Sequence, residues 1–253
     1  MQNLISIIII TKNEEKNIEQ TLQSVLWADE IIIIDCFSTD NTKQIATKYP
    51  VNFIEKKWEG FSSQKSFALQ QATNNFVLSI DADEVVTEEL RIEIQNLLKS
   101  EIEFDAYFIS RKNYFLGKWI KSCGWYPDYQ IRFGKKDKLF LTNREVHESF
   151  ESNGRIGYLK NSIDHFTYDS IHHYFEKFNN YTTLDVEAKL LKTKGNINWT
   201  NLILNPISQF LRMFLSKKGY KDGLHGLVVS LLSSFYTLVV YAKCWEKLNS
   251  KKK

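Results

Sequence analysis

Two apolar runs rich in β-branched residues open the chain, at positions 4–10 and 30–34. Nearly continuous runs of this kind are typical of parallel strands that are covered on both faces. Between them, Ile18, Leu22 and Val25 recur at helical spacing. The order of strand, helix and strand predicts a βαβ unit in which helices cover the sheet.

Helical and extended patterns continue to alternate after this unit. They follow the order 40–49 helical, 51–57 extended, 63–72 helical and 76–80 extended. Such alternation favours a mainly parallel sheet with right-handed crossovers, whose ligands bind beyond the carboxyl ends of the strands. Three polar residues, Thr11, Asp35 and Asp81, fall at those ends.

The character of the chain changes after a helix predicted at 87–100. Residues 106–166 are aromatic and rich in turns, so we expect extended segments that complete the sheet and form the wall of a cleft. From residue 171 onward the pattern is helical. The expected domains are a large domain at 1–170, with halves at 1–100 and 101–170, and a helical extension at 171–253 that associates with a membrane or forms a dimer.

The helical extension contains an apolar run at 225–242 that has no acidic residue, lysine or arginine. It has about the minimum length of a membrane span, but it could also pack in the core, form a dimer interface or lie in the bilayer surface. Because Gly226, Ser230 and Ser233 interrupt it, we favour attachment to the membrane surface. The segment from Pro206 predicts an amphipathic helix. Basic side chains near its end are available to anionic head groups, namely Arg212, Lys217, Lys218 and Lys221.

The chain has 253 residues, of which 43% are hydrophobic and 25% charged, a globular composition that fits one large domain or a domain with an appendage. Its formal net charge of +3 does not indicate a nucleic-acid partner. The cysteines Cys36, Cys123 and Cys244 are far apart and odd in number, which fits a reducing compartment. Because residues 4–10 follow no basic leader, we interpret them as a strand and not a signal peptide, and expect a cytoplasmic location.

Two aspartates follow the extended run at 76–80, in the segment SIDADEV. In an extended backbone alternate side chains point the same way, so Asp81 and Asp83 would lie about 7 Å apart and flank one hard cation. Magnesium or manganese holding a diphosphate suits such a pair. A short acidic turn also often only caps a strand or the next helix, so this motif alone does not decide.

Neighbouring loops carry further polar candidates. Asp35 could accept a hydrogen bond from a base or a ribose hydroxyl, or it could cap a helix within DCFSTDN, which Asp40 could do equally. Lys65 opens the helix before the extended run at 76–80, where its ammonium could meet phosphate or base oxygens, although a solvated lysine is the more common case.

The order of these segments resembles glycosyltransferase family 2, inverting enzymes with a nucleotide-sugar-binding α/β fold. The similar segments are SIIIITKNEE, IIIIDCFSTDNT, WEGFSSQKSFAL and VLSIDADE. Three more resemble the bacterial subgroup that contains lipopolysaccharide core β-1,4-glucosyltransferases: RKNYFLGKWIKSCGWYPDYQIRFG, TNREVHESF and FEKFNNYTTLDVEAKL. The resemblance implies a glycosyltransferase A-type α/β fold with a mainly parallel central sheet and a C-terminal helical extension. It makes 1–170 the catalytic domain, with a nucleotide-binding half at 1–100 and an acceptor half at 101–170.

The resemblance also implies a role for each residue at the predicted sheet edge. These roles are nucleoside binding for Thr11 and Asp35, nucleotide contact for Lys65, contact with ribose or diphosphate for Asp81, and metal binding for Asp83. The chain departs from the family at Cys36 and Phe37, where an Asp-Gly pair is usual. The loss of the glycine could shift this turn.

Inverting transfer needs a base at the acceptor hydroxyl and charge stabilisation on the departing diphosphate. Asp128, in GWYPDYQIRF, is the candidate base. Its aromatic neighbours Trp125, Tyr126 and Tyr129 could pack on sugar faces and desolvate the carboxylate, which would raise its proton affinity. The alternative is an ordinary turn at Pro127 with aromatic core packing. A divalent cation would neutralise the diphosphate.

Two further residues have candidate roles at the leaving diphosphate. His147, in REVHESF, lies where a family histidine can approach the metal or the diphosphate, although a single histidine more often has a structural role. Glu145 and Glu148 are reserve candidates for acid or base work. Arg132 could hold diphosphate oxygens with its planar fork, or could form a structural ion pair.

Together these features predict a metal-dependent inverting hexosyltransferase that moves glucose from UDP-glucose onto a lipopolysaccharide core or related glycolipid. We expect it to be peripheral on the inner face of the bacterial cytoplasmic membrane and to use magnesium or manganese as cofactor. We expect no nucleic-acid partner, and a homodimer is possible. The alternatives are a nonenzymatic nucleotide-sugar-binding membrane scaffold and a glycosyltransferase for another surface polysaccharide. A haloacid-dehalogenase phosphatase is rejected because no G-D-x-x-x-D motif follows VLSIDADEV, and a nucleotidyltransferase lacks its glycine-rich loop near Thr11.

Overall fold

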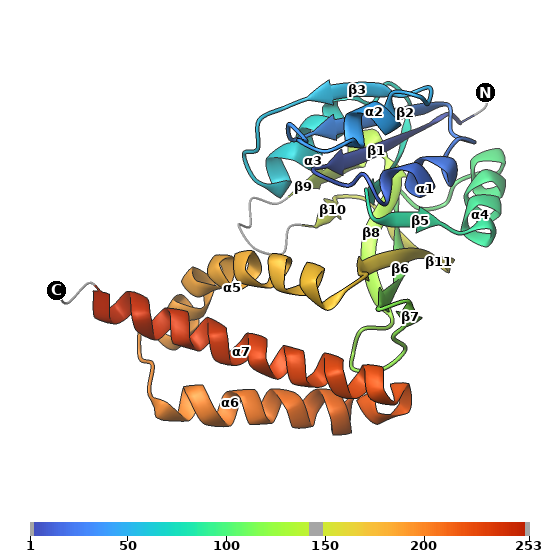
Figure 1. Cartoon of the computed structure of the whole chain (residues 1–253). Helices are drawn as coiled ribbons and strands as arrows, with labels where there is room; N and C mark the ends of the chain where they lie inside the picture. The colour runs from blue at the N-terminus through green and yellow to red at the C-terminus, as the bar shows by residue number, and fades with distance from the viewer. Residues whose placement is uncertain (1–2, 142–148, 251–253) are drawn as a thin grey trace. The chain divides into compact units, whose positions relative to one another are not determined.

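The computed structural model describes residues 3–141 and 149–250. Contacts divide the chain into two compact units. The first unit comprises Met1–Arg111 and Asp128–His165, and the second comprises Lys112–Pro127 and Phe166–Lys253. The second unit thus takes in residues 112–127 and 166–170, which the sequence analysis assigned to the catalytic domain. Figure 1 labels the helices and strands.

The described residues form a nine-stranded sheet and a separate two-stranded one. The large sheet begins with four parallel strands, in the order β3 (Asn52–Glu55), β2 (Glu30–Asp35), β1 (Ile5–Thr11) and β4 (Phe76–Asp81). It continues through β8 (Asp128–Lys135), β6 (Ala106–Phe115), β11 (Ile156–Tyr168) and β5 (Glu84–Val86), and β7 (Lys118–Trp119) pairs with β6. The pairs β4–β8, β8–β6 and β11–β5 are antiparallel. The sheet is therefore mixed, and the parallel order expected from the βαβ pattern describes its first four strands.

The helices of the first unit fall where the sequence predicts them. They are α1 (Ile18–Gln23), α2 (Thr42–Ala46), α3 (Phe61–Gln71) and α4 (Glu88–Lys99). A 3-10 turn (Lys136–Lys138) leads into β9 (Leu139–Leu141), which pairs with β10 (Phe150–Ser152). The predicted helix at 40–49 is shorter in the structure, because turns occupy both of its ends.

Strand β1 is buried on both faces, as its continuous apolar run predicts. Ile5, Ile7 and Ile9 pack in a cluster with α1 and α4, whereas Ile8 and Ile10 pack with α3 on the other face. Burying each such side chain stabilises the fold by about 1.5–3 kcal/mol. This strand therefore anchors the sheet edge at which the polar residues lie.

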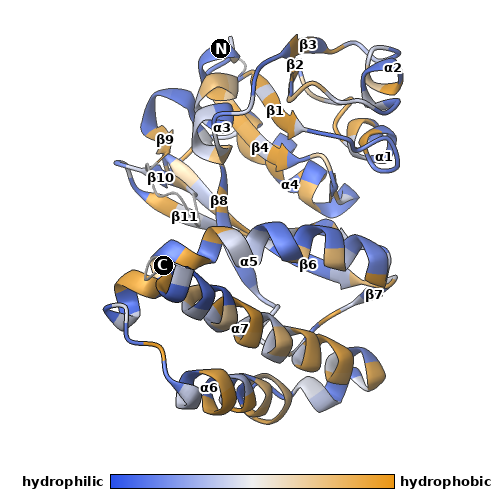
Figure 2. Ribbon diagram, turned by 60° about the vertical axis from the view of Figure 1, so that its left-hand side comes forward, coloured by the Kyte–Doolittle hydropathy of each residue, from blue (hydrophilic) through white to orange (hydrophobic). Residues whose placement is uncertain are grey.

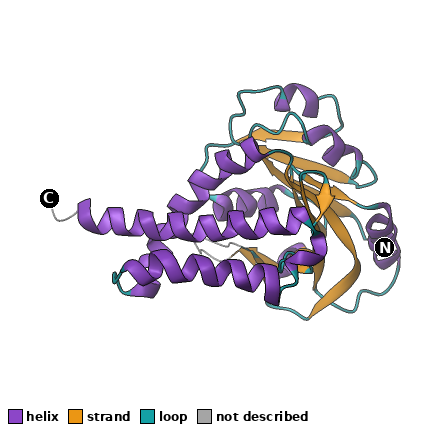
Figure 3. Cartoon of the chain, turned by 60° about the horizontal axis from the view of Figure 1, so that its bottom comes forward, coloured by secondary structure: helices purple, strands orange, loops and turns teal. Residues whose placement is uncertain are grey.

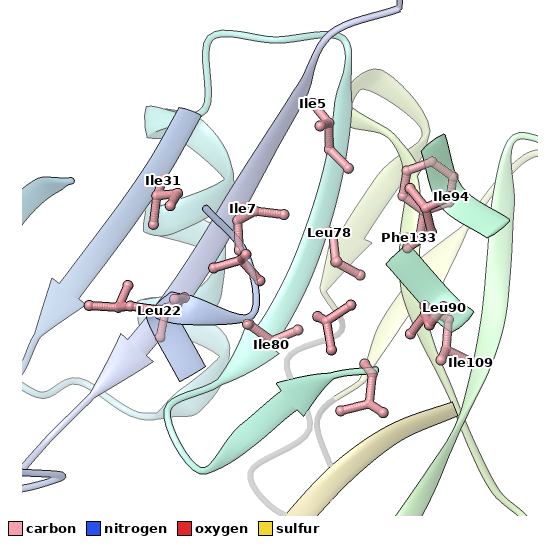
Figure 4. Packing of buried hydrophobic residues seen from close by; sticks show 14 of the residues in the cluster. Ile5, Ile7, Leu22, Ile31, Leu78, Ile80, Leu90, Ile94, Ile109 and Phe133 are labelled. Carbon is pink, nitrogen blue, oxygen red and sulfur yellow. The ribbon is translucent and has the colours of Figure 1, made fainter. Parts of the chain in front are cut away.

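Helix α4 closes one face of the sheet. In Figure 4, Leu90 and Ile94 of α4 lie beside Ile109 and Phe133, and all four side chains belong to one buried cluster. The helix begins at a capped residue: the Oγ1 of Thr87 accepts a hydrogen bond from the backbone N–H of Leu90 (3.3 Å).

The second unit is mainly helical. It contains α5 (Ile171–Thr193), α6 (Trp199–Leu211) and α7 (Leu224–Ser250), with a π-helical turn (Arg212–Ser216) and a 3-10 turn (Gly219–Asp222) between the last two. The long helix α7 packs against both α5 and α6 (Figure 3). The predicted helical extension is therefore present from residue 171 onward, and the apolar run at 225–242 lies within α7.

Candidate active site

The carboxyl ends of the parallel strands bring three predicted site residues to one edge of the first unit. Thr11 ends β1 and is directly paired with Asp35, the last residue of β2. Asp81 ends β4 and pairs with Ile10 of β1. This juxtaposition follows from the parallel order of the strands.

The loop after β2 uses Asp35 as a turn acceptor. Asp35 is fully buried and accepts hydrogen bonds from the backbone N–H of Ser38 (2.8 Å) and from its hydroxyl (2.5 Å). Asp40 accepts from Thr42 at the start of α2. Both aspartates therefore have local capping partners. Phe37, which stands where the family usually has glycine, is exposed and has a φ of 55°, so the left-handed turn is kept without a glycine.

Thr11 has a different environment from Asp35. Its side chain is buried, and its Oγ1 has no hydrogen-bond partner among the residues that the structure describes. A buried hydroxyl without a partner is costly. It is therefore available to a ligand that reaches this edge of the sheet.

Asp81 is held by two cations. Its Oδ1 lies 2.9 Å from the Nζ of Lys65, and its Oδ2 accepts from the Nη2 of Arg132 (2.8 Å). Burial works to raise the pKa of Asp81, but the charges of Arg132 and Lys65 outweigh it and hold that pKa well below its usual value. Both carboxylate oxygens thus already have charged partners, and Lys65 is not a solvated lysine.

Arg132 is almost completely buried, with 3% of its surface exposed. Its Nη2 donates to Asp81 and also to Oε1 of Glu84 (2.7 Å). Burial works to lower the pKa of Arg132, but the two carboxylates outweigh it and raise that pKa. This geometry corresponds to the second of the two roles considered for Arg132, a structural ion pair. The buried guanidinium group is not exposed to a diphosphate.

A shift in strand register places Arg132. Tyr107 of β6 pairs with Phe133, but Phe108 pairs with Ile131, so Arg132 is the extra residue of a bulge in β8. Bulges of this kind re-aim one side chain. Here the bulge accompanies the contact of Arg132 with the end of β4.

Glu84 connects these groups to Asp128. Glu84 is fully buried, and its Oε2 accepts the backbone N–H of Asp81 (2.8 Å). Its Oε1 lies 3.3 Å from the Nη1 of Arg111. Arg111 in turn donates to Oδ2 of Asp128 from Nη2 (2.6 Å) and Nε (2.9 Å). A continuous chain of ion pairs therefore runs from the end of β4 to the start of β8.

The surroundings of Asp128 differ from those expected. The sequence predicted aromatic desolvation, whereas the carboxylate is paired with Arg111 and accepts a further hydrogen bond from Gln130 (3.2 Å). A guanidinium stabilises the ionised carboxylate. The neighbouring Tyr129 is exposed, and its ring contacts that of Tyr158 (centroids 5.1 Å apart). Trp125 and Tyr126 belong to the second unit.

Asp83 lies in a turn, because β4 ends at Asp81 and residues 82–83 precede β5. The two aspartates of the motif therefore do not share one extended segment. Asp83 is 7% exposed, and its Oδ1 lies 3.6 Å from the Nε2 of His165. His165 reaches this position because it is the register partner of Glu84 in the antiparallel pairing of β11 with β5. Asp83 and His165 thus bring one oxygen and one nitrogen donor together.

This donor pair fits a divalent cation that takes its remaining ligands from a diphosphate and water, as magnesium usually does. The carboxylate oxygen of Asp83 is the kind of ligand that magnesium and manganese prefer, whereas imidazole nitrogen is more typical of other transition metals. Within residues 3–141 and 149–250, no group of three or more His, Cys, Asp or Glu side chains is arranged to hold a metal. The predicted metal ligand His147 lies outside the described residues, as do Glu145 and Glu148.

Three residues of the site were not singled out in the sequence: Glu84, Arg111 and His165. Glu84 directly follows the two aspartates, and an acidic residue next to such a motif was the available signal. Arg111 and His165 carried no local signal, because they reach the site only through the pairing of β6 with β8 and of β11 with β5.

Comparisons with known proteins identify the family. The model of Glycosyl transferase family 2 matches residues 6–166. The chain is 27% identical over 255 residues to the lipopolysaccharide core biosynthesis glycosyltransferase LpsC of Rhizobium meliloti, covering 96% of this chain and 92% of that protein. It is 33% identical over 255 residues to an uncharacterized glycosyltransferase of Rickettsia typhi, covering 96% and 87%.

Among solved structures, Staphylococcus aureus TarS 1–349 in complex with UDP-GlcNAc is 18% identical and has a TM-score of 0.48, with 93% of this chain and 81% of that chain covered. The family model spans more than half of the chain and includes the whole edge described above. With the mixed sheet and its C-terminal helices, it confirms the expected glycosyltransferase A-type α/β fold. The chain is a member of glycosyltransferase family 2 and hence an enzyme of the transferase kind.

Proposed function

We propose that the protein is a metal-dependent inverting glycosyltransferase that moves a hexose, glucose from UDP-glucose, onto a hydroxyl of a lipopolysaccharide core or related glycolipid. The observation that carries this proposal is the chain of ion pairs from Asp81 through Arg132, Glu84 and Arg111 to Asp128. It holds the proposed base at a fixed position relative to the edge where the nucleotide is expected. The similarity to the Rhizobium meliloti protein over most of the chain supports the substrate class.

Asp128 is the proposed base. Arg111 fixes the orientation of its carboxylate through two hydrogen bonds, so that one group is held in place to accept the proton. The proton of the acceptor hydroxyl passes to Asp128 as the hydroxyl oxygen bonds to the anomeric carbon from the side opposite the diphosphate. The bond from that carbon to the diphosphate oxygen breaks, and no sugar is attached to the enzyme.

The nucleotide would bind at the carboxyl ends of β1, β2 and β4. The buried hydroxyl of Thr11 offers a hydrogen bond to the nucleoside, and we retain Asp35 as a second nucleoside contact. A donor phosphate would compete with Asp81 for the ammonium of Lys65. Arg132 would hold Asp81 in position through its ion pair.

A divalent cation bound by Asp83 and His165, magnesium or manganese, would neutralise charge on the leaving diphosphate. His147 remains a predicted further ligand. We also propose a cytoplasmic location at the inner face of the bacterial cytoplasmic membrane, where a glycolipid acceptor is met. Formation of a homodimer stays a prediction.

The test is a screen of nucleotide sugars with manganese or magnesium, in which nucleotide release and sugar transfer are measured. We expect metal-dependent release with one donor, and a loss of about a hundredfold or more in Asp128→Asn with nucleotide binding retained. Asp83→Ala should also lose turnover. Asp137→Asn, on the exposed 3-10 turn, is the matched control and should keep wild-type turnover.

Each failure has a distinct meaning. Wild-type turnover in Asp128→Asn would remove the assigned base. Tight binding of a nucleotide sugar by the wild type without any release or transfer would favour the nonenzymatic scaffold. Activity that is indifferent to chelation would remove the metal.

A further inference from the structure

Helix α6 exposes its most apolar side chains. These are Trp199 (67% exposed), Ile203 (50%), Leu204 (52%), Ile207 (51%), Leu211 (45%) and, just beyond the helix, Leu215 (55%). Five of them recur at intervals of four residues, so they run along the helix as a stripe, which we call the α6 stripe. In Figure 2 the ribbon of α6 is largely orange, the colour of hydrophobic residues.

The opposite side of α6 is held by polar contacts. The Nε2 of Gln209 donates to the Oγ of Ser233 in α7 (2.8 Å), and the hydroxyl of Ser234 donates to the carbonyl of Pro206 (2.8 Å). A helix on a water-soluble surface normally packs its apolar face inward and exposes its polar face. In α6 large apolar side chains lie on the exposed side as well, which points to an apolar medium or partner outside the stripe.

The charge around the α6 stripe has one sign. Between Glu187 and Asp222 the chain has seven basic residues and no acidic one. Four of the basic residues are exposed close to the end of α6: Arg212, Lys217, Lys218 and Lys221. An apolar stripe flanked by basic side chains is the pattern of a helix that lies in the surface of an anionic bilayer.

We propose that the α6 stripe inserts into the surface of an anionic membrane, with the helix parallel to the bilayer plane and the basic cluster on lipid phosphates. A second copy of the chain is a less suitable partner, because a twofold interface pairs the same patch with itself, and the segment that carries this patch has basic residues and no acidic one between Glu187 and Asp222. This inference deepens the proposed function by naming the surface that would bring the enzyme to a lipid-linked acceptor.

Helix α7 has another role in this arrangement. It is long and apolar enough to cross a membrane by length and composition, and 28% of its most apolar window is buried. Its side chains are engaged by both neighbours: the hydroxyl of Tyr236 donates to Asp185 of α5 (2.7 Å), and Ser233 and Ser234 contact α6. Helix α7 therefore packs against α6 through contacts that leave the α6 stripe exposed.

The test is flotation of the full chain with vesicles of phosphatidylcholine alone and of an equimolar phosphatidylcholine and phosphatidylglycerol mixture. We expect binding to the anionic vesicles only. Ile207→Ser with Leu211→Ser should weaken the partition coefficient at least about tenfold. Replacing Lys217, Lys218 and Lys221 by glutamine should weaken it about a hundredfold and remove most of its salt dependence.

The matched control is Leu26→Ser with Ile92→Ser, two side chains of similar exposure in the first unit, 45% and 46%. This variant should float like the wild type. Absence of wild-type binding to anionic vesicles would overturn the proposal. So would a wild-type dimer, seen by light scattering, that the serine pair in α6 converts to a monomer.

Donor-dependent nucleotide release in detergent-free buffer separates this inference from the proposed function. The serine pair in α6 should lose vesicle binding and keep this release. Vesicle binding without any release would overturn the proposed transferase activity and leave the membrane surface standing. Release without vesicle binding would overturn the membrane surface, together with the proposed membrane location, and leave the transferase activity standing.

Discussion

Glu84 is the residue on which the geometry of the candidate site depends most. Its carboxylate is fully buried, and it contacts two guanidinium groups and one backbone N–H. A buried charge is tolerated only when partners of this kind surround it. Glu84 thus links Arg132, which holds Asp81, to Arg111, which holds the proposed base.

Replacing Glu84 by glutamine should destabilise the protein by about 3–5 kcal/mol, because Arg132 would keep its buried charge with one carboxylate fewer. Denaturant unfolding at neutral pH measures this loss. Glu103→Gln, which removes an exposed carboxylate near Arg155, should change the unfolding free energy by less than about 0.5 kcal/mol. Equal effects of the two substitutions would contradict the role of Glu84.

Asp81 should make stability depend on pH in the acid range. Its pKa in the folded protein lies well below the usual value, whereas in the unfolded chain it is about 3.9. A depressed carboxyl pKa adds stability that is complete above the unfolded value and is lost as the pH falls through the folded one. Asp81→Asn should therefore be less stable at neutral pH and lose less stability on acidification.

Unfolding free energies measured from neutral pH into the acid range check this expectation. Asp137→Asn should keep the wild-type pH profile, because Asp137 is exposed and its nearest ion-pair partner is 3.8 Å away. An unchanged acid slope in Asp81→Asn would show that other groups carry the pH dependence.

At the scale of elements, α4 shows how one helix face is selected. Leu90, Ile94 and Leu98 recur at intervals of four residues and are buried against the sheet, while Ile92 is exposed. This is the spacing of an amphipathic helix. The face of α4 could thus be predicted from the sequence, and the structure adds which strands it covers.

Ile94→Ala should cost about 2–5 kcal/mol of unfolding free energy, because it leaves a cavity beneath α4. Ile92→Ala, in the same helix and at an exposed position, should stay within about 0.5 kcal/mol of the wild type. Thermal or denaturant unfolding compares the two. A similar loss in both variants would mean that helix propensity and not burial sets the stability of α4.

At the scale of the whole molecule, the described site residues all belong to the first unit, although they come from its two separate chain segments. Binding of donor and cation should therefore stabilise the first unit against unfolding. A ligand at a hundred times its dissociation constant adds about 2.7 kcal/mol.

Manganese and UDP together should raise the midpoint of thermal unfolding more than UDP alone does. His165→Ala should remove the manganese-dependent part, because it deletes the nitrogen donor beside Asp83. His172→Ala, at a highly exposed histidine of α5, should respond like the wild type. A full manganese response in His165→Ala would mean that the ion is not held by this pair.

The sequence by itself determined the features that depend on local spacing. The continuous isoleucine runs of β1 and β2 and the 3.6-residue repeats of α1 and α4 are local patterns of this kind. Thr11, Asp35 and Asp81 stand where the apolar runs end. Long motifs were enough to identify the family. Each motif is a continuous stretch of residues, so tertiary contacts were not needed to recognise it.

The tertiary structure decided which of these groups meet. Asp81 faces Lys65 and Arg132, Asp83 faces His165, and the α6 stripe faces outward. These contacts arise from antiparallel pairing of distant strands, from the bulge in β8 and from the packing of α6 on α7. No local pattern encodes them, because a side chain at one strand end gains its charge partners only when the strand beside it is fixed.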